Sequence, residues 1–262
     1  MIERTNNDVD VVNYYYDSHP TEEDLMGESR PHRALVDYLK HVLEWLFRHQ
    51  ACAIYENFNF FQTADEHEYP LAPDVALIKG VTASPDISWR VGKDGPPPQV
   101  VFEIASPKTW ARDLEEKPAQ YAAMGVQEYY AYDPYKTPLP LSRRKGGRLF
   151  GWQLDKDTGL MQRMELGPDG RLWSQHLNSL LVPAGAYLRL YDRYGNLRLT
   201  QGEAADRRVE AEAQARRFAE KRAEAEFQAR QEAERRAEAE AEKARIMAEK
   251  LRALGMDPDH LI

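Results

Sequence analysis

Hydrophobic residues early in the chain recur at spacings that predict one helix. Leu35, Leu39, Val42 and Leu46 are separated by four, three and four residues, so they share one face of a helix. Pro31 stands at the position where a first helical turn accepts proline. The pattern predicts a helix that begins near residue 31 and packs one face against a sheet.

Short apolar runs bounded by turn residues predict that sheet. The main runs are Ala51–Phe61, Val75–Ile78, Val100–Ala105 and Glu128–Tyr132, followed by Leu149–Leu154, Gly159–Leu166, Leu172–Ser174 and Tyr187–Asp192. The later runs are joined by tight turns and lie too close together for crossover helices, which favours an antiparallel extension of the same domain. The predicted fold class is α/β, in its α+β form: a core sheet flanked by helices, with a β-rich extension.

A second helix is predicted between the runs Val100–Ala105 and Glu128–Tyr132. Asp113 and Glu116 have the spacing of a capping box, and Gly125 stands where the helix would stop. Asp113, Lys117 and Tyr121 are four residues apart, so they lie near one helix face. The sequence therefore directs a polar stripe toward one place.

The composition changes abruptly after residue 200, which divides the chain into a body, residues 1–200, and a helical tail, residues 201–262. The tail is rich in Ala, Glu, Arg and Lys and repeats every 14 residues from Val209 to Lys250. Fourteen residues are two heptads, the period of a left-handed coiled coil, although Ala dominates the repeat. The tail is either a solvated helix or a self-association helix, and Gly255 is expected to end it.

Charge and cysteine content narrow the class of protein. The net charge is −8 over 262 residues, of which the body carries −6. This balance argues against broad adhesion to polyanions but leaves room for a local basic patch in the Pro-rich connection at residues 135–147. Cys52 is the only cysteine, so the chain cannot form an internal disulfide. No apolar run approaches the length of a membrane helix, and a cytoplasmic protein without a membrane partner is expected.

The candidate site consists of two acids and a lysine. Glu103 stands inside a strand that reads as buried on both faces, and a carboxylate there needs a partner. Asp74 follows Pro73 at the mouth of another buried strand. Asp74, Glu103 and the carbonyl of Ile104 would supply oxygen ligands to Mg²⁺ or Mn²⁺, and Lys117 an ammonium. Such a set suits metal-assisted hydrolysis of a phosphodiester.

Several other residues are secondary candidates. His32 and Glu44 lie on the first predicted helix and are able to reach a site, although solvated side chains are the commoner outcome there. Asp86 repeats the Pro-Asp dipeptide in a loop, Lys108 is the fallback for Lys117, and Tyr121 reads as a wall residue. Asp113 belongs to the polar stripe.

The motifs, in this order and spacing, resemble the Uma2 family of the PD-(D/E)xK nuclease superfamily, which has the restriction-endonuclease-like fold. The motifs that match are Ala72-Pro73-Asp74-Val75, Phe102-Glu103-Ile104-Ala105-Ser106-Pro107-Lys108-Thr109, Asp113-Leu114-Glu115-Glu116-Lys117, Tyr121 and Gly125-Val126-Gln127-Glu128-Tyr129-Tyr130. The resemblance implies Asp74 and Glu103 as metal ligands and Lys117 as a catalytic lysine moved onto the helix. Ala105 occupies the usual lysine position, a departure from the pattern.

The resemblance implies a Mg²⁺- or Mn²⁺-dependent endonuclease that acts on nucleic acid, with DNA as the expected form. The tail permits a homo-oligomer such as a dimer, in which two copies of the site would cut both strands of a duplex more easily. One alternative is a nuclease-fold module that binds nucleic acid or a protein without cutting. Another is that the charged tail is the main functional part. The sequence shows no base-reading element, so it leaves the target sequence open.

Overall fold

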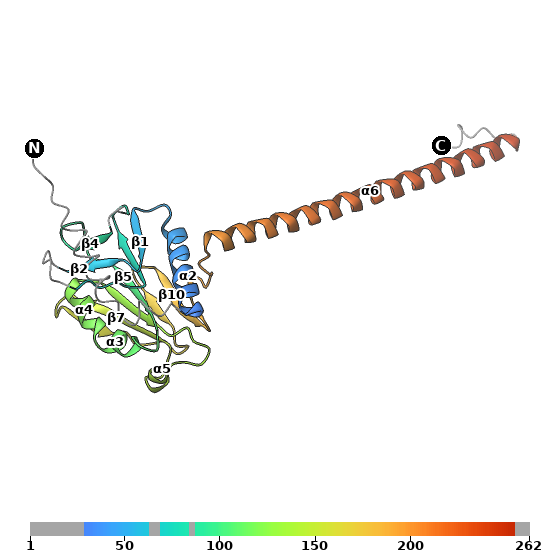
Figure 1. Cartoon of the computed structure of the whole chain (residues 1–262). Helices are drawn as coiled ribbons and strands as arrows, with labels where there is room; N and C mark the ends of the chain where they lie inside the picture. The colour runs from blue at the N-terminus through green and yellow to red at the C-terminus, as the bar shows by residue number, and fades with distance from the viewer. Residues whose placement is uncertain (1–28, 63–68, 84–86, 255–262) are drawn as a thin grey trace, which may run out of the picture. The chain divides into compact units, whose positions relative to one another are not determined.

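The computed structural model describes residues 29–62, 69–83 and 87–254 (Figure 1). Contacts between residues divide the chain into two compact units, Met1–Gln201 and Gly202–Ile262. Each unit is described by itself. The candidate Asp86 and the expected helix end at Gly255 lie outside the described residues.

A six-stranded sheet forms the centre of the first unit. Its strand order is β1-β3-β5-β6-β7-β8, and only the β5–β6 pair is parallel. The strands are β1 (Cys52–Glu56), β3 (Val75–Lys79), β5 (Val100–Ile104), β6 (Glu128–Tyr132), β7 (Leu149–Asp155) and β8 (Leu160–Arg163). A parallel pair needs a crossover. The chain makes that crossover through α3 (Trp110–Glu115) and α4 (Lys117–Met124).

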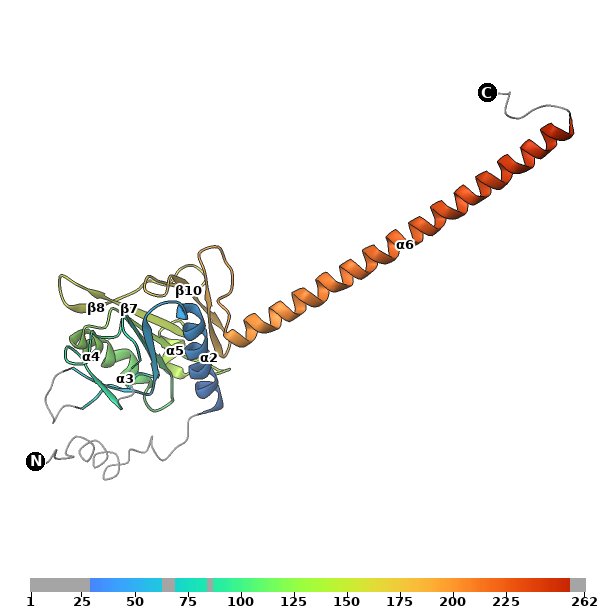
Figure 2. The same ribbon diagram turned by 90° about the horizontal axis from the view of Figure 1, so that it is seen from above.

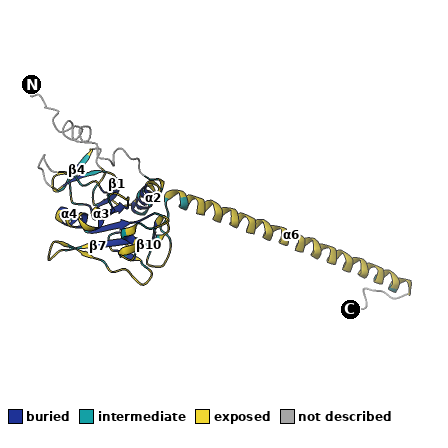
Figure 3. Cartoon of the chain, turned by 60° about the horizontal axis from the view of Figure 1, so that its bottom comes forward, coloured by how far each residue is buried: buried dark blue, intermediate teal, exposed yellow. Residues whose placement is uncertain are grey.

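Two hydrophobic layers cover the central sheet, one on each face (Figure 2). Helix α2 (Arg30–Phe47) and a second sheet, β11-β10-β9, pack on one face. The strands of that sheet are β9 (Leu172–Ser174), β10 (Ser179–Ala184) and β11 (Tyr187–Tyr191). Helices α3 and α4 and the parallel pair β2 (Asn59–Phe61) and β4 (Ser88–Arg90) pack on the other. The strands β3, β5 and β6 are therefore buried on both faces. Figure 3 shows the buried interior of this unit in dark blue.

Helix α2 forms as its sequence pattern predicts. The Ser29 hydroxyl accepts a hydrogen bond from the backbone N–H of His32, so Ser29 caps the helix, and Pro31 lies in its first turn. Leu35, Leu39 and other apolar residues on one face are completely buried. The cap fixes the start of the helix, and with it the position of His32.

The predicted fold class is confirmed, with local corrections. The run Ala51–Phe61 is two strands, because Asn57 adopts a left-handed conformation between them. Strand β10 was not predicted, and the connection 135–147 contains a short helix, α5 (Pro140–Arg144). The helix predicted from Asp113 to Met124 is the two helices α3 and α4, and Asp113 lies inside α3, so the capping box is wrong.

The described part of the second unit consists almost entirely of one continuous helix, α6 (Gln201–Ala253). None of its residues is buried. Its length and polarity agree with the Ala-rich repeat of the sequence. Among the described residues, none of the helices combines the length and the apolar character that a membrane span requires.

A buried carboxylate joins the two sheets. Glu128, at the start of β6, accepts hydrogen bonds on Oε2 from the hydroxyls of Ser174 (2.5 Å) and Tyr130 (3.2 Å). Its Oε1 accepts from the backbone N–H of Gln175 (2.8 Å) and His176 (3.3 Å). Both oxygens are thus occupied by neutral donors, which is the arrangement of a structural carboxylate.

Glu128→Gln is expected to destabilise the protein by about 1–3 kcal/mol, because the amide nitrogen would face donors instead of accepting from them. Chemical denaturation measures this change, with Glu165→Gln at an exposed position as the control. Equal stability of the two variants would show that the hydrogen bonds to Glu128 do not hold the sheets together.

Candidate active site

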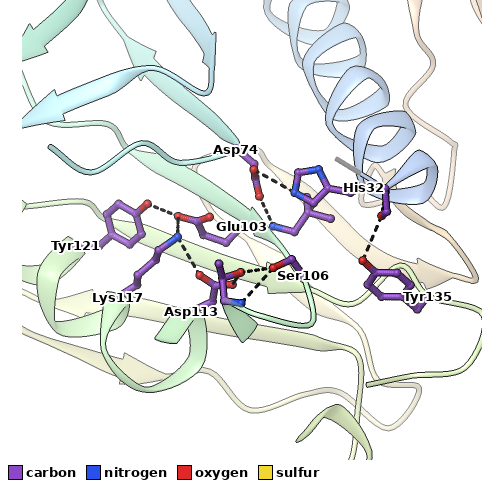
Figure 4. Close-up of polar contacts among 11 residues, drawn as sticks. His32, Asp74, Glu103, Ser106, Asp113, Lys117, Tyr121 and Tyr135 are labelled. Atoms are coloured by element: carbon purple, nitrogen blue, oxygen red, sulfur yellow. Dashed lines mark hydrogen bonds and ion pairs between the residues drawn. The ribbon is translucent and has the colours of Figure 1, made fainter. Parts of the chain in front are cut away.

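Glu103 is the centre of the candidate site. Its side chain projects from β5 toward α4, and the residue is only 4% exposed (Figure 4). Glu103 Oε1 lies 2.7 Å from the Lys117 ammonium and accepts a hydrogen bond from the Tyr121 hydroxyl. Within the described part of the chain, no hydrogen bond or ion pair reaches Glu103 Oε2. One oxygen of this carboxylate is therefore held in place while the other is available to a ligand.

The break between α3 and α4 places Lys117. Helix α4 begins at Lys117, and Pro118 stands at its start, where the missing N–H costs no helical hydrogen bond. Lys117 Nζ also lies 2.9 Å from Asp113 Oδ1, one helical turn earlier along the chain. Lys117 is buried, and its ammonium bridges the carboxylates of Glu103 and Asp113. Because Lys117 reaches Glu103, the site does not require Lys108 as a substitute.

The loop after β5 orients Asp113. The Ser106 hydroxyl accepts a hydrogen bond from the backbone N–H of Thr109 (3.1 Å) and lies 2.8 Å from the Thr109 hydroxyl. The Thr109 hydroxyl donates to Asp113 Oδ2 at 3.0 Å. The sequence analysis missed Ser106 and Thr109. Their spacing is the signal, since Ser and Thr commonly form such turns before a helix.

Asp74 faces Glu103 across neighbouring strands. The register between β3 and β5 pairs Val75 with Phe102, and continuing it pairs Asp74 with Glu103. Asp74 Oδ2 accepts a hydrogen bond from the Ile104 backbone N–H at 2.5 Å, and Asp74 Oδ1 lies 3.3 Å from His32 Nε2 (Figure 4). The start of α2 and the end of β5 thus fix the same carboxylate.

Pro73 gives the Ile104 carbonyl a special position. The same register places Ile104 opposite Pro73, and the Ile104 N–H points toward β3 because it donates to Asp74. In an antiparallel pair the N–H and C=O of one residue point to the same neighbour. Proline has no N–H to offer. Pro73 therefore cannot donate a hydrogen bond to the Ile104 carbonyl. This property suits the carbonyl to act as a third oxygen ligand of a metal.

The oxygen donors fit a hard divalent cation. Over the described residues, no group of three or more His, Cys, Asp and Glu is arranged to hold a metal ion. A metal in this site would rely on Asp74, Glu103, the Ile104 carbonyl and water. That set is typical of Mg²⁺, which keeps several waters and needs only one or two carboxylates.

Comparison with known proteins identifies the family. The family model of Uma2, described as "Putative restriction endonuclease", matches residues 21–176. The chain belongs to the Uma2 family. Among solved structures, it is similar to "a putative nuclease belonging to DUF820" from Anabaena variabilis ATCC 29413. The two share 13% identity over 58% of this chain and 75% of that one, with a TM-score of 0.39. No curated protein matches the chain.

The acids of the candidate site outnumber the lysine beside them. Asp74, Glu103 and Asp113 are all buried, and the Lys117 ammonium pairs with Glu103 and Asp113. Burial raises the pKa of Glu103 to about 8, outweighing Lys117, and raises the pKa of Asp113 as well. Burial alone would lower the pKa of Lys117, but Glu103 and Asp113 together raise it, so the lysine stays charged. A bound divalent cation would compensate the remaining negative charge.

Among the described residues, two other buried acids differ from this cluster. The hydrogen bonds that Glu128 and Asp133 accept there come from neutral hydroxyl and backbone donors, and both oxygens of each are used. Glu103 has an ammonium and a buried phenol on one oxygen instead. Burial alone therefore does not distinguish the candidate site. The asymmetry of the partners around Glu103 does.

The remaining candidates lie apart from this cluster or at its edge. Glu44 is exposed on α2, and Lys108 is exposed in the loop before α3. Neither makes a described contact with Asp74, Glu103 or Lys117. His32 and Asp113 do contact the cluster, through Asp74 and Lys117.

A basic surface adjoins the site through α5. The buried Ser142 hydroxyl accepts a hydrogen bond from the indole N–H of Trp110, the first residue of α3, at 2.8 Å. This contact fixes α5 beside the helix that carries Asp113. The residues that surround it include four exposed cations: Lys136, Arg143, Arg144 and Lys145.

Without metal, the free energy of unfolding is expected to fall as the pH rises from about 5 to 8. Folded Glu103 keeps its proton up to about pH 8, whereas an unfolded glutamate loses it near 4.5, so the folded state binds more protons in this range. The slope attributable to Glu103 is at most about 1.4 kcal/mol per pH unit.

Denaturation of the wild type and Glu103→Gln across this pH range in a chelating buffer measures the effect. The variant should show a flatter profile, because its amide does not titrate. Parallel profiles would contradict the raised pKa of Glu103.

Proposed function

We propose that the protein is a metal-dependent endonuclease that hydrolyses phosphodiester bonds of DNA. Membership of the Uma2 family supports a nuclease, and the catalytic assignment rests on the buried cluster. The observation that carries it is that Asp74 and Glu103 face each other beside one lysine, with Glu103 Oε2 unoccupied by the described residues. We assign the nuclease to residues 1–200 and an assembly role to residues 201–262.

Asp74, Glu103 and the Ile104 carbonyl would hold Mg²⁺ or Mn²⁺. When bound, such an ion activates a water and stabilises the charge that develops on the phosphate. His32 holds the Asp74 carboxylate from the side of α2, and the Ile104 N–H holds it from the side of β5. These contacts keep the carboxylate in place before the ion arrives.

Lys117 and Tyr121 act on the protonation and orientation of Glu103. The Lys117 ammonium stabilises the ionised form of Glu103 that a metal requires, and it offers positive charge to a phosphate. Burial and Glu103 raise the pKa of Tyr121 well above 10, so the phenol stays protonated and donates its hydrogen bond. Asp113 anchors the ammonium from the other side. Lys117 thus takes the role of the lysine that the usual pattern has at position 105, where this chain has alanine.

The exposed cations around α5 support a nucleic-acid partner. The body of the chain has a net charge of −6, so binding to a polyanion needs a local concentration of positive charge. The Ser142–Trp110 hydrogen bond fixes this surface next to α3. Phosphates of a bound strand would contact it while one phosphodiester lies at Glu103.

A second candidate function is a module that binds nucleic acid without cutting it. The absence of a lysine at position 105 and the acidic body favour it. The same residues would then hold a metal or an ion pair for stability alone. The two functions differ in whether metal binding leads to strand cleavage.

Glu103→Gln is expected to weaken Mg²⁺ and Mn²⁺ binding at least about tenfold and to abolish nicking of supercoiled plasmid, because it removes a charged ligand. Calorimetric titration and gel analysis measure the two effects. The control is Glu128→Gln, which neutralises an equally buried acid outside the site and should retain both activities.

Metal binding in the wild type without nicking would favour the module that does not cut. Absence of metal binding in both proteins would contradict the metal site itself. Loss of both activities in Glu128→Gln as well would mean that folding, and not the site, explains the result. Circular dichroism of each variant separates that case.

Arg143→Glu combined with Arg144→Glu is expected to lower the affinity for duplex DNA about tenfold. The slope of log affinity against log salt concentration should fall by the equivalent of about two phosphate contacts. Fluorescence anisotropy in the Glu103→Gln background, where cutting is prevented, measures this at several salt concentrations. The control Lys93→Glu with Lys156→Glu changes the net charge equally at exposed positions elsewhere. Equal losses in both pairs would contradict a local binding surface.

A further inference from the structure

Helix α6 presents a long surface that nothing in the described part of the chain covers. It has 53 residues, none of them buried, and Figure 3 shows exposure along its whole length. Its internal support consists of a few exposed ion pairs between successive turns, such as Arg216–Glu220 (3.0 Å). Each such pair contributes only about 0.3–0.5 kcal/mol. Most helices in proteins gain their stability from packing one face.

One line of positions along α6 forms a complete heptad seam. It begins at Gly202, ends at Leu254 and advances in alternating steps of three and four residues. In its middle, pairs of alanines alternate with a glutamate and an arginine. Ala219 and Ala223 are followed by Glu226 and Arg230, and the next repeat keeps this order except that Ala244 replaces the arginine. The bulky apolar members of the seam gather at its C-terminal end.

A parallel pair of α6 helices conflicts with these charges. In register, each seam residue would face its own copy, so Glu226 would meet Glu226 and Arg230 would meet Arg230. Glu212, Arg216 and Glu240 would do the same. Five layers of like charge would then oppose association. Their repulsion is larger than the stabilisation that packing of the alanine layers supplies.

An antiparallel pair gives every charged layer an opposite charge except one, in which a glutamate has no partner of opposite charge. With a two-fold axis beside Gln228, Glu226 of one copy faces Arg230 of the other, and Arg216 faces Glu240. Glu212 faces Ala244. Inside one chain, within the described residues, neither Arg230 nor Glu240 forms an ion pair. Both are therefore available to a second copy.

The apolar layers fit the same register. Ala219 faces Ala237 and Ala223 faces Ala233, which allows close approach near the centre. Toward each end, every layer contains one long side chain, which faces a valine, an alanine or a glycine of the other copy. These end layers are Val209 with Met247, Ala205 with Leu251 and Gly202 with Leu254. Val209 and Met247 are 66% and 61% exposed in the single chain, so pairing would bury both.

Registers shifted by one repeat are poorer. A shift in one direction leaves Met247 and Leu251 beyond the end of the partner. A shift in the other places Leu254 against Arg216 and shortens the overlap. The register about Gln228 uses the whole of α6, whose middle residue is Phe227.

We propose that α6 binds a second copy of itself as an antiparallel coiled coil with its two-fold axis beside Gln228. The chain enters α6 at Gln201, so the two points of attachment lie at opposite ends of the coil, about 80 Å apart. This inference does not depend on the proposed nuclease activity.

Distances between spin labels test the orientation. Gln228→Cys and Gln214→Cys, each in a Cys52→Ser background of the full chain, place labels on the outer face of the proposed coil. Labels at 228 should lie at the same level of the coil, separated only by its width. Labels at 214 are 28 residues apart along an antiparallel coil, so an axial separation of about 42 Å is added to that width. Equal distances at the two positions would establish a parallel pair and overturn the proposal.

A charge reversal tests the register. Glu226→Arg places arginine against Arg230 of the other copy twice, and should raise the dissociation constant measured by sedimentation at least about tenfold. Adding Arg230→Glu restores opposite charges and should restore the dimer. Circular dichroism checks that each variant keeps its helix. A monomeric wild type at micromolar concentration, or a single variant that dimerises as the wild type does, would contradict the proposal.

Discussion

The carboxylate of Glu103 inside a doubly covered strand is the constraint on which the site depends. An anion in that position is unfavourable unless charge and hydrogen bonds compensate it. Lys117 and Tyr121 supply the compensation, and they are available because the crossover breaks into α3 and α4 at Glu116, just before Lys117 and Pro118. The turn at Ser106 then fixes Asp113, which holds the same ammonium.

A cluster of this kind is a poor way to stabilise a fold. Burying charged pairs is often no better than apolar packing, and here two buried acids share one lysine while a third, Asp74, lies beside His32. Glu128 shows how the same protein stabilises a buried carboxylate where only structure is at stake, with four neutral donors on two oxygens. The cluster of buried acids with raised pKa values around Glu103 therefore indicates a ligand site, because perturbed titratable groups concentrate at functional sites.

The sequence allowed the fold class and much of the cluster to be predicted, because both depend on local patterns. An acid within an apolar run and a lysine four residues after Asp113 are visible in one segment. The break at Glu116 was missed because a capping box gave a competing helix start, and β10 was missed because its residues alternate weakly. The contact between His32 and Asp74 joins distant elements, so sequence reasoning reached it only as a candidate. The antiparallel seam of α6 needed the helix bounds.

The central claim is that Asp74 and Glu103 form a metal site. Crystals of the wild type grown with Mn²⁺ test it most directly, through the anomalous difference density. The account predicts a peak bounded by the Asp74 and Glu103 carboxylates and the Ile104 carbonyl, with Lys117 still beside Glu103. Full occupancy of Mn²⁺ elsewhere, with none at this position, would contradict it.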